Sequence, residues 1–127
     1  LDELSSLEEL DCSFNALETL DVSKLGKLER LFCSDNKLTS LELEDTNLEY
    51  LDCSCNQLTE LDVDKLISLK TLYCYSNNLS ELQLSNLSEL QSLNCSVNQI
   101  VDLDVSNLGS LKEILCCKNA TYFIYLL

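Results

Sequence analysis

Leucines recur along this chain in a pattern of apolar and polar positions that repeats about every 21 residues. Aligned on the leucine that opens each unit, the repeats start at Leu7, Leu28, Leu48, Leu69, Leu90 and Leu111, with spacings of 21, 20, 21, 21 and 21 residues. The shared pattern is LxxLxCxxNxLxxLxVxxLxx, and residues 1–6 fit the tail of a preceding unit. A fixed period of this length predicts stacked supersecondary units.

The first half of each unit alternates between apolar and polar residues, as around Leu51 and Cys53. This period of two is typical of a short strand with one buried face, and stacked units would place these strands side by side. The second half, such as "LDVD" from residue 61, also alternates, so we expect short strands or extended structure there and little helix. One unit cannot fold alone. Its roughly seven buried side chains contribute roughly 1.5 to 3 kcal/mol each, whereas ordering the backbone of its roughly 21 residues costs roughly 1 to 2 kcal/mol for each residue.

Two irregularities interrupt the repeat. The unit 28–47 is one residue short late in "LELEDTN", and we expect the gap on the outer, convex side. The segment "TYFIYLL" at 121–127 departs from the pattern, as either a cap or a cut-off repeat would. Proline is absent, and only Gly26 and Gly109 are candidates for special turns. We interpret residues 1–127 as one repeat domain, taken from a longer protein because the chain begins inside a repeat.

Cysteine and asparagine each occupy one column of the aligned units. The columns are Cys12, Cys33, Cys53, Cys74, Cys95 and Cys116, and Asn15, Asn36, Asn56, Asn77, Asn98 and Asn119. A cysteine between two inward leucines is expected to act as a small apolar filler with a free thiol. An asparagine at the turn that leaves the strand can bond to backbone groups of its own and the adjacent unit. Both columns are therefore interpreted as structural.

This pattern resembles the leucine-rich repeat family over essentially the whole chain, and within it the bacterial 21-residue type in which LxxLxCxxN precedes LxxLDVxxL. The resemblance implies a right-handed solenoid with a parallel sheet on its concave face, used for recognition and rarely for catalysis. It leaves the compartment open between a bacterial cell surface, a secreted protein and an effector.

Packing explains the cysteines better than the other roles open to them. Neighbouring cysteines in register have parallel Cβ vectors, so interior disulfides would distort the ladder. Cys53-Ser-Cys55 and Cys116-Cys117 are the only close pairs, and the chain has no histidine and no pair of CxxC knuckles, which disfavours both zinc and a cysteine nucleophile. We therefore expect no metal, no cofactor and no catalytic residue. Cys55 and Cys117 lie outside the column and are the two thiols expected to meet solvent.

Charge narrows the range of partners. The net charge is −14, from 22 acidic and 8 scattered basic residues, which disfavours nucleic acid and anionic membranes. No apolar stretch is long enough to span a bilayer within this segment. The second half-units place Asp21, Glu42, Asp62, Gln83 and Asp104 at one position. We expect a solvated acidic flank there, with a calcium site as the alternative.

The exposed side of the first-half strands carries the candidate binding site. The residues expected to project from it are Glu9, Asp11, Ser13, Arg30, Phe32, Ser34, Tyr50, Asp52, Ser54, Thr71, Tyr73, Tyr75, Ser92, Asn94 and Ser96. Arg30, Phe32, Tyr50, Tyr73 and Tyr75 form a patch of residue types that are enriched at interface hot spots. Exposed tyrosine also suits any strand, so β propensity alone is the alternative. The sequence thus predicts a non-enzymatic scaffold that binds a protein partner, with a structural spacer or display segment as the alternative.

Overall fold

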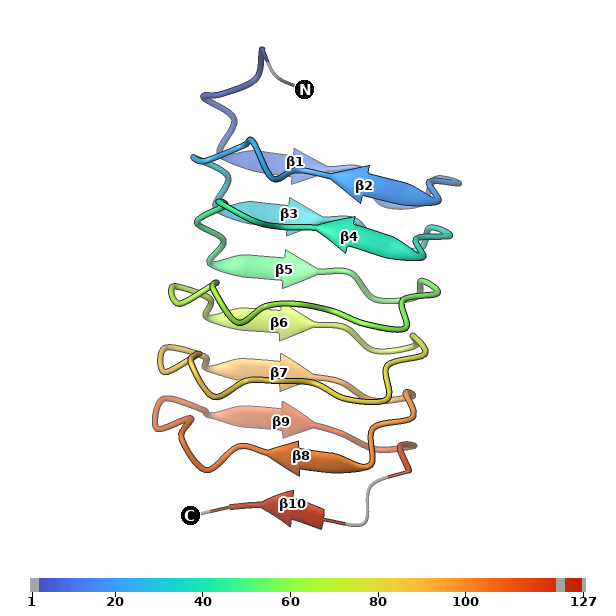
Figure 1. Cartoon of the computed structure of the whole chain (residues 1–127), viewed down its shortest axis with the longest axis vertical. Coiled ribbons are helices and arrows are strands. Elements are labelled where there is room, and N and C mark those ends of the chain that lie inside the picture. Colours follow the sequence, from blue (N-terminus) through green and yellow to red (C-terminus); the bar gives the residue numbers. More distant parts are fainter. Residues whose placement is uncertain (1–2, 121–122, 127) are drawn as a thin grey trace.

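The computed structural model describes residues 3–120 and 123–126, and none of these residues is helical. All of its strand pairs are parallel. The strands are β1 (Glu9–Asp11), β2 (Thr19–Asp21), β3 (Arg30–Phe32), β4 (Ser40–Glu42), β5 (Tyr50–Asp52), β6 (Thr71–Tyr73), β7 (Ser92–Asn94), β8 (Asp102–Asp104), β9 (Glu113–Leu115) and β10 (Phe123–Tyr125). The chain winds through them as a solenoid, which confirms the predicted fold class (Figure 1).

One sheet of six strands runs the length of the stack, in the order β1-β3-β5-β6-β7-β9. The residues that pair follow the repeat spacing, since Arg30 lies opposite Glu9 on one side and Tyr50 on the other, and Tyr50 lies opposite Thr71. Each unit contributes one strand to this sheet. We call its exposed side the concave face.

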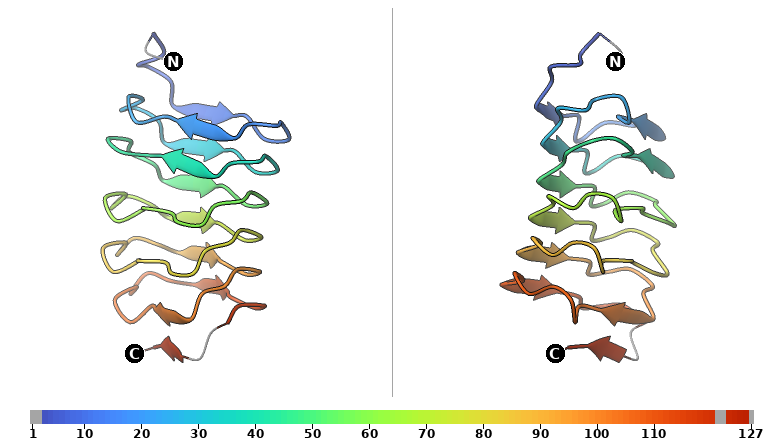
Figure 2. Two further views of the ribbon diagram at one scale, coloured as in Figure 1. Left: turned by 45° about the vertical axis from the view of Figure 1, so that its right-hand side comes forward. Right: turned by 60° about the vertical axis from the view of Figure 1, so that its left-hand side comes forward.

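The opposite side of the stack is less regular, as Figure 2 shows. Two separate pairs form there, β2 with β4 and β8 with β10. Residues 60–62 and 81–83, which hold the equivalent position in the two middle units, are not strands. The expected second-half strands therefore form only towards the ends of the stack. The pairing of β10 with β8 also shows that residues 123–125 of "TYFIYLL" continue the repeat, whereas residues 121, 122 and 127 lie outside the described residues.

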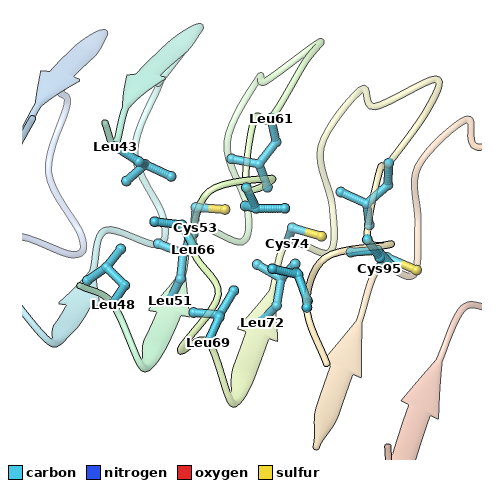
Figure 3. Close-up of a cluster of buried hydrophobic side chains, with 14 of the residues drawn as sticks. Leu43, Leu48, Leu51, Cys53, Leu61, Leu66, Leu69, Leu72, Cys74 and Cys95 are labelled. Atoms are coloured by element: carbon cyan, nitrogen blue, oxygen red, sulfur yellow. The ribbon is translucent and has the colours of Figure 1, made fainter. Parts of the chain in front are cut away.

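The core lies between these two sides. Leu31, Leu51, Leu72 and Leu93 are adjacent in register and completely buried. Figure 3 shows leucines and cysteines of neighbouring units pointing into this interior. Because each leucine packs against its counterparts in the units before and after it, burial is shared between neighbours, and stability depends on stacking.

The turns after the concave strands use left-handed backbone at residues other than glycine. Phe14, Asp35, Cys55, Ser76, Val97 and Lys118 all have φ between 54° and 56°. No described glycine has a positive φ, so the expectation that Gly26 and Gly109 mark the special turns is wrong. The repeated strain is offset by the hydrogen bonds that the following asparagine makes, which are described below.

The short unit loses its residue in the connection from β4 to β5. Asp45 adopts φ 63° there, and Thr46 Oγ1 donates a hydrogen bond of 2.7 Å to the carbonyl of Leu43. Asn47 Nδ2 donates to the carbonyl of Gly26 in the preceding unit at 2.7 Å. The gap thus falls outside the six-stranded sheet, and the concave strands stay in register across it.

Candidate functional site

The asparagine column links each unit to the one before it. Asn56 Nδ2 lies 3.0 Å from the carbonyl oxygen of Cys53 in its own unit and 3.0 Å from that of Cys33 in the preceding unit. Its Oδ1 accepts a hydrogen bond of 2.9 Å from the backbone N–H of Leu38. The same bridging contacts recur at Asn36, Asn77, Asn98 and Asn119. Within the described part of the chain, Asn15 of the first unit bonds only to carbonyls of its own unit.

The cysteine column lies inside the stack. Cys33, Cys53, Cys74 and Cys95 are completely buried, while Cys12 and Cys116 in the terminal units are partly buried, and all eight cysteines are free. Loss of hydration raises the pKa of the Cys53 and Cys74 thiols far above the ordinary range and raises the pKa of Cys95 to about 12. These thiols are protonated at neutral pH and do not act as nucleophiles.

Four thiols, and not two, are at least partly accessible. Cys55 is half-buried, and burial followed by the charges of Asp35 and Asp52 raises its pKa. Cys117 is exposed, and its Sγ lies 3.3 Å from Ser96 Oγ. Cys12 and Cys116 join them because each terminal unit is covered on one side only. The described residues contain no group of three cysteine, aspartate or glutamate side chains placed to hold a metal ion.

The predicted aromatic residues do lie together on the concave face. The Phe32 and Tyr50 rings are 4.8 Å apart between centroids, and the Tyr50 and Tyr73 rings meet edge to face at 5.9 Å. The guanidinium carbon of Arg30 lies 5.5 Å from the Phe32 centroid and 6.0 Å from that of Tyr50. We call Arg30, Phe32, Tyr50, Tyr73 and Tyr75 the aromatic patch.

Not every residue expected on this face is exposed. Ser34, Ser54 and Ser96 are buried, and Ser54 Oγ has no hydrogen-bond partner among the described residues. These serines lie where each unit leaves its strand and turns towards the asparagine. The units before and after them in the stack therefore cover a side chain as short as serine. Tyr75 occupies the same column and reaches out further, because its side chain is long.

A cavity of about 340 Å³ opens on the concave face beside the aromatic patch. Tyr50, Tyr73 and Tyr75 line it together with Asp52, Ser92, Leu93, Asn94, Glu113 and Leu115. Tyr73 Oη lies 3.5 Å from Ser92 Oγ, which in turn donates to Glu113 Oε2 at 3.1 Å. Glu113 and Leu115 are not among the exposed residues predicted from the sequence, which extend only to the fifth unit. Continuing the column of Tyr50 by 21 residues at a time leads directly to Glu113.

The acidic flank lies on the opposite side of the stack. Glu42, Asp62 and Gln83 line a larger cavity of about 700 Å³, together with Ser40, Leu41, Glu60, Leu61, Val63, Asp64 and Glu81. Asp21 is paired with Glu42 in register between β2 and β4. Lys65 Nζ lies 2.7 Å from Glu44 Oε1 nearby. The cavity occurs where the second-half pairing is interrupted.

A stack of near-identical turns, with an exposed parallel sheet and no helix in its described residues, defines a β-solenoid repeat protein. Family models for leucine-rich repeats match residues 6–28 and 46–89. The chain therefore belongs to the leucine-rich repeat family. No long apolar helix that could cross a membrane occurs among the described residues.

Solved structures place the chain among bacterial relatives. The functional domain of InlJ from Listeria monocytogenes, described as including a cysteine ladder, is 37% identical with a TM-score of 0.90, over 94% of this chain and 27% of that one. The internalin InlF of the same species (24% identity, TM-score 0.75, 96% of this chain and 45% of that one) shares the fold. A leucine-rich repeat protein of Leptospira interrogans also shares the fold, with 22% identity and a TM-score of 0.71 over 97% of this chain and 40% of that one. The chain thus spans less than half of each relative, and none of the curated proteins matches it.

Proposed function

We propose that this chain is a non-enzymatic recognition module that binds a protein partner through the aromatic patch on its concave face. The observation that supports it is the continuous contact of three rings from three successive strands, Phe32, Tyr50 and Tyr73. Aromatic side chains carry a large share of binding energy at interfaces, and few χ angles have to be fixed when they bind. A rigid sheet holds these rings in place before a partner arrives.

The flanks of the patch fit the same role. Arg30 contributes a residue type that is common at hot spots, and it is already held by Glu9 at 3.2 Å. Beside the patch, β6 and β7 present threonine, serine and asparagine side chains, which supply a polar rim of the kind that surrounds interface cores. A protein partner therefore suits this face better than a small molecule.

The test is a triple variant, Phe32→Ser, Tyr50→Ser and Tyr73→Ser, in which the buried leucine and cysteine columns are untouched. We expect partner capture from a bacterial or host protein mixture to be lost, and the melting temperature to change little. Asp21→Asn and Asp104→Asn on the acidic flank form the control and should leave capture unchanged. Unchanged capture by the triple variant would remove the aromatic patch as the binding site.

The second candidate is a structural spacer or display segment of a longer bacterial surface or effector protein. The observation that favours it is the unbroken register of the six-stranded sheet from β1 to β9, with units starting at 7, 28, 48, 69, 90 and 111, which makes a rigid stack. A spacer depends on length and stability alone. Deleting one internal unit, residues 69–89, would impair a spacer mainly through shortening, whereas the triple serine variant would leave it fully functional.

A further inference from the structure

The concave face contains two places where carboxylates lie beside aromatic rings, and among the described residues only the first of them also holds a cation. In the first, the Arg30 guanidinium lies 3.2 Å from Glu9 Oε2 and within 6.0 Å of the Phe32 and Tyr50 ring centroids. A planar cation is thus held between a carboxylate and aromatic rings. This is the geometry in which arginine gains both charge pairing and cation–π attraction.

The second environment is the cavity on the other side of the patch, where no described side chain supplies a cation. Tyr50, Tyr73 and Tyr75 contribute the rings, Asp52 and Glu113 contribute the carboxylates, and no basic residue is among those that line it. Its volume of about 340 Å³ lies at the lower end of the range for ligand pockets, roughly 300 to 1,000 Å³. The space suits one long side chain better than a larger ligand.

Neither carboxylate is neutralised within the described part of the chain. Asp52 Oδ1 accepts a hydrogen bond of 3.0 Å from the backbone N–H of Ser54, and Glu113 accepts one from Ser92 Oγ. Neither forms an ion pair with a described residue. Burial, followed by the negative charge of Asp52, raises the pKa of the Tyr50 hydroxyl, so the field of that carboxylate reaches the rings.

We propose that this cavity, which extends from β5 to β9, binds an arginine side chain of the protein partner, with its guanidinium on the tyrosine rings next to Asp52 and with Glu113, three strands away, adding negative charge. The inference rests on the proposed function, because it names the chemistry that the concave face recognises. Arginine is favoured over lysine because the guanidinium stacks on rings and bonds to a carboxylate through two N–H groups, and because Arg30 occupies the equivalent environment next to it.

The chain supplies a matched design for removing the charge alone. Asn94 follows Asp52 in the same column two units later, and its Oδ1 accepts the N–H of Ser96 at 3.1 Å, as Asp52 Oδ1 accepts that of Ser54. An asparagine at residue 52 therefore keeps the backbone contact and the shape of the strand. Glu113→Gln likewise keeps an acceptor for Ser92 Oγ.

The experiment is an NMR titration of the isotope-labelled chain with N-acetylarginine amide, which needs no knowledge of the partner. We expect a dissociation constant on the order of millimolar, as the size of the probe suggests, with amide shifts concentrated in β5, β6, β7 and β9. N-acetylcitrulline amide, the neutral analogue, should shift these resonances little. Asp52→Asn combined with Glu113→Gln should weaken binding about tenfold, while Asp62→Asn on the acidic flank should leave it unchanged.

Four results would overturn the proposal: no binding of the arginine probe, equal shifts with citrulline, equal binding by N-acetyllysine amide, or shifts centred on the acidic flank. The outcome of this titration can be distinguished from the outcome of the capture test of the proposed function. If the arginine probe fails to bind but the triple serine variant loses partner capture, the recognition face stands and only the arginine assignment fails. If the probe binds at the cavity but the triple variant still captures its partner, the proposed function fails and an isolated guanidinium site remains.

Discussion

The two halves of each repeat have similar alternating sequences, but only one half builds a continuous sheet. The first halves pair in register through all six units, from β1 to β9. The second halves pair as β2 with β4 and β8 with β10, and the two middle units contribute no strand on that side. Alternation alone therefore predicts which side chains are buried, and it does not ensure that neighbouring strands bond.

The difference lies in the polar links between units. Each first half ends in an asparagine, and from the second unit onwards its amide joins two units, as Asn56 does between the carbonyls of Cys33 and Cys53. The middle second halves have acidic side chains at the outward positions, such as Asp62 and Glu81, which line a cavity there together with Glu42 of β4. Bridging hydrogen bonds fix the spacing on one side. Like charge alone does not decide pairing on the other side, because Asp21 and Glu42 lie opposite each other in the β2–β4 pair.

Alkaline unfolding should show the largest effect, because the buried thiols all belong to the first halves. Cys95 has a folded-state pKa of about 12 against an ordinary 9.0, which corresponds to roughly 4 kcal/mol at about 1.4 kcal/mol per unit. A raised folded pKa means that the unfolded chain loses the proton first. The stabilisation is complete below pH 9 and is lost as the pH rises towards 12. We expect circular dichroism to report complete unfolding within this window.

Single cysteine variants identify the groups responsible. Cys53→Ala should reduce the slope of unfolding free energy against pH by about one proton in the same alkaline window, because this buried thiol no longer titrates on unfolding. An unaltered slope in the Cys53 variant would assign the alkaline transition to other groups.

Core truncation should distinguish the two sides next. Leu72 on β6 is completely buried between units, so Leu72→Ala should cost about 4 kcal/mol of unfolding free energy. Leu61, which faces the core from the opposite side, is 8% exposed and lines the 700 Å³ cavity. Because its surroundings are already open, Leu61→Ala should cost about 2 kcal/mol. Urea titration measures both values, and equal costs would mean that the two sides are packed equally well.

The sequence predicted the repeat frame, the parallel sheet and the inward leucines because these depend on spacing alone. It could not predict where the second-half strands pair, since "LDVD" at 61–64 and "LDVS" at 103–106 alternate alike, yet only the latter contains part of a strand. For the candidate site, the column positions placed Phe32, Tyr50 and Tyr73 on one face. The distances between rings and the cavity next to Glu113 depend on side-chain rotamers, which spacing does not specify.

Removing one asparagine should give the third effect in size. Asn56→Ala leaves the N–H of Leu38 without its partner and removes the hydrogen bond that bridges the carbonyls of Cys33 and Cys53, although these carbonyls still accept from Asn36 and Asn77. We expect a loss of about 3 kcal/mol. Asn15→Ala should cost about 1 kcal/mol, because Asn15 is exposed and bonds within its own unit. Thermal melts of both, with the exposed Asn107→Ala as control, measure the difference. Equal losses would show that the bridge to the preceding unit contributes nothing.

The smallest effect should come from the acidic flank. Asp62 lines the cavity with Glu42, Glu60 and Asp64, and Asp62→Asn keeps the hydrogen bond from the Asp64 backbone N–H at 3.1 Å. Relief of like-charge repulsion should raise the melting temperature by about one or two degrees at low salt, and this gain should vanish at high salt, where the charges are screened.

A bound cation would reverse this outcome. If the flank is only solvated carboxylates, EDTA and added calcium should each leave the melting temperature of the unaltered chain nearly unchanged. If the flank holds a calcium ion, EDTA would lower the melting temperature by many degrees and added calcium would restore it. Asp62→Asn would then destabilise the chain by removing a ligand. The sign of the Asp62→Asn effect at low salt therefore decides whether the acidic flank is a solvated surface or the location of an ion.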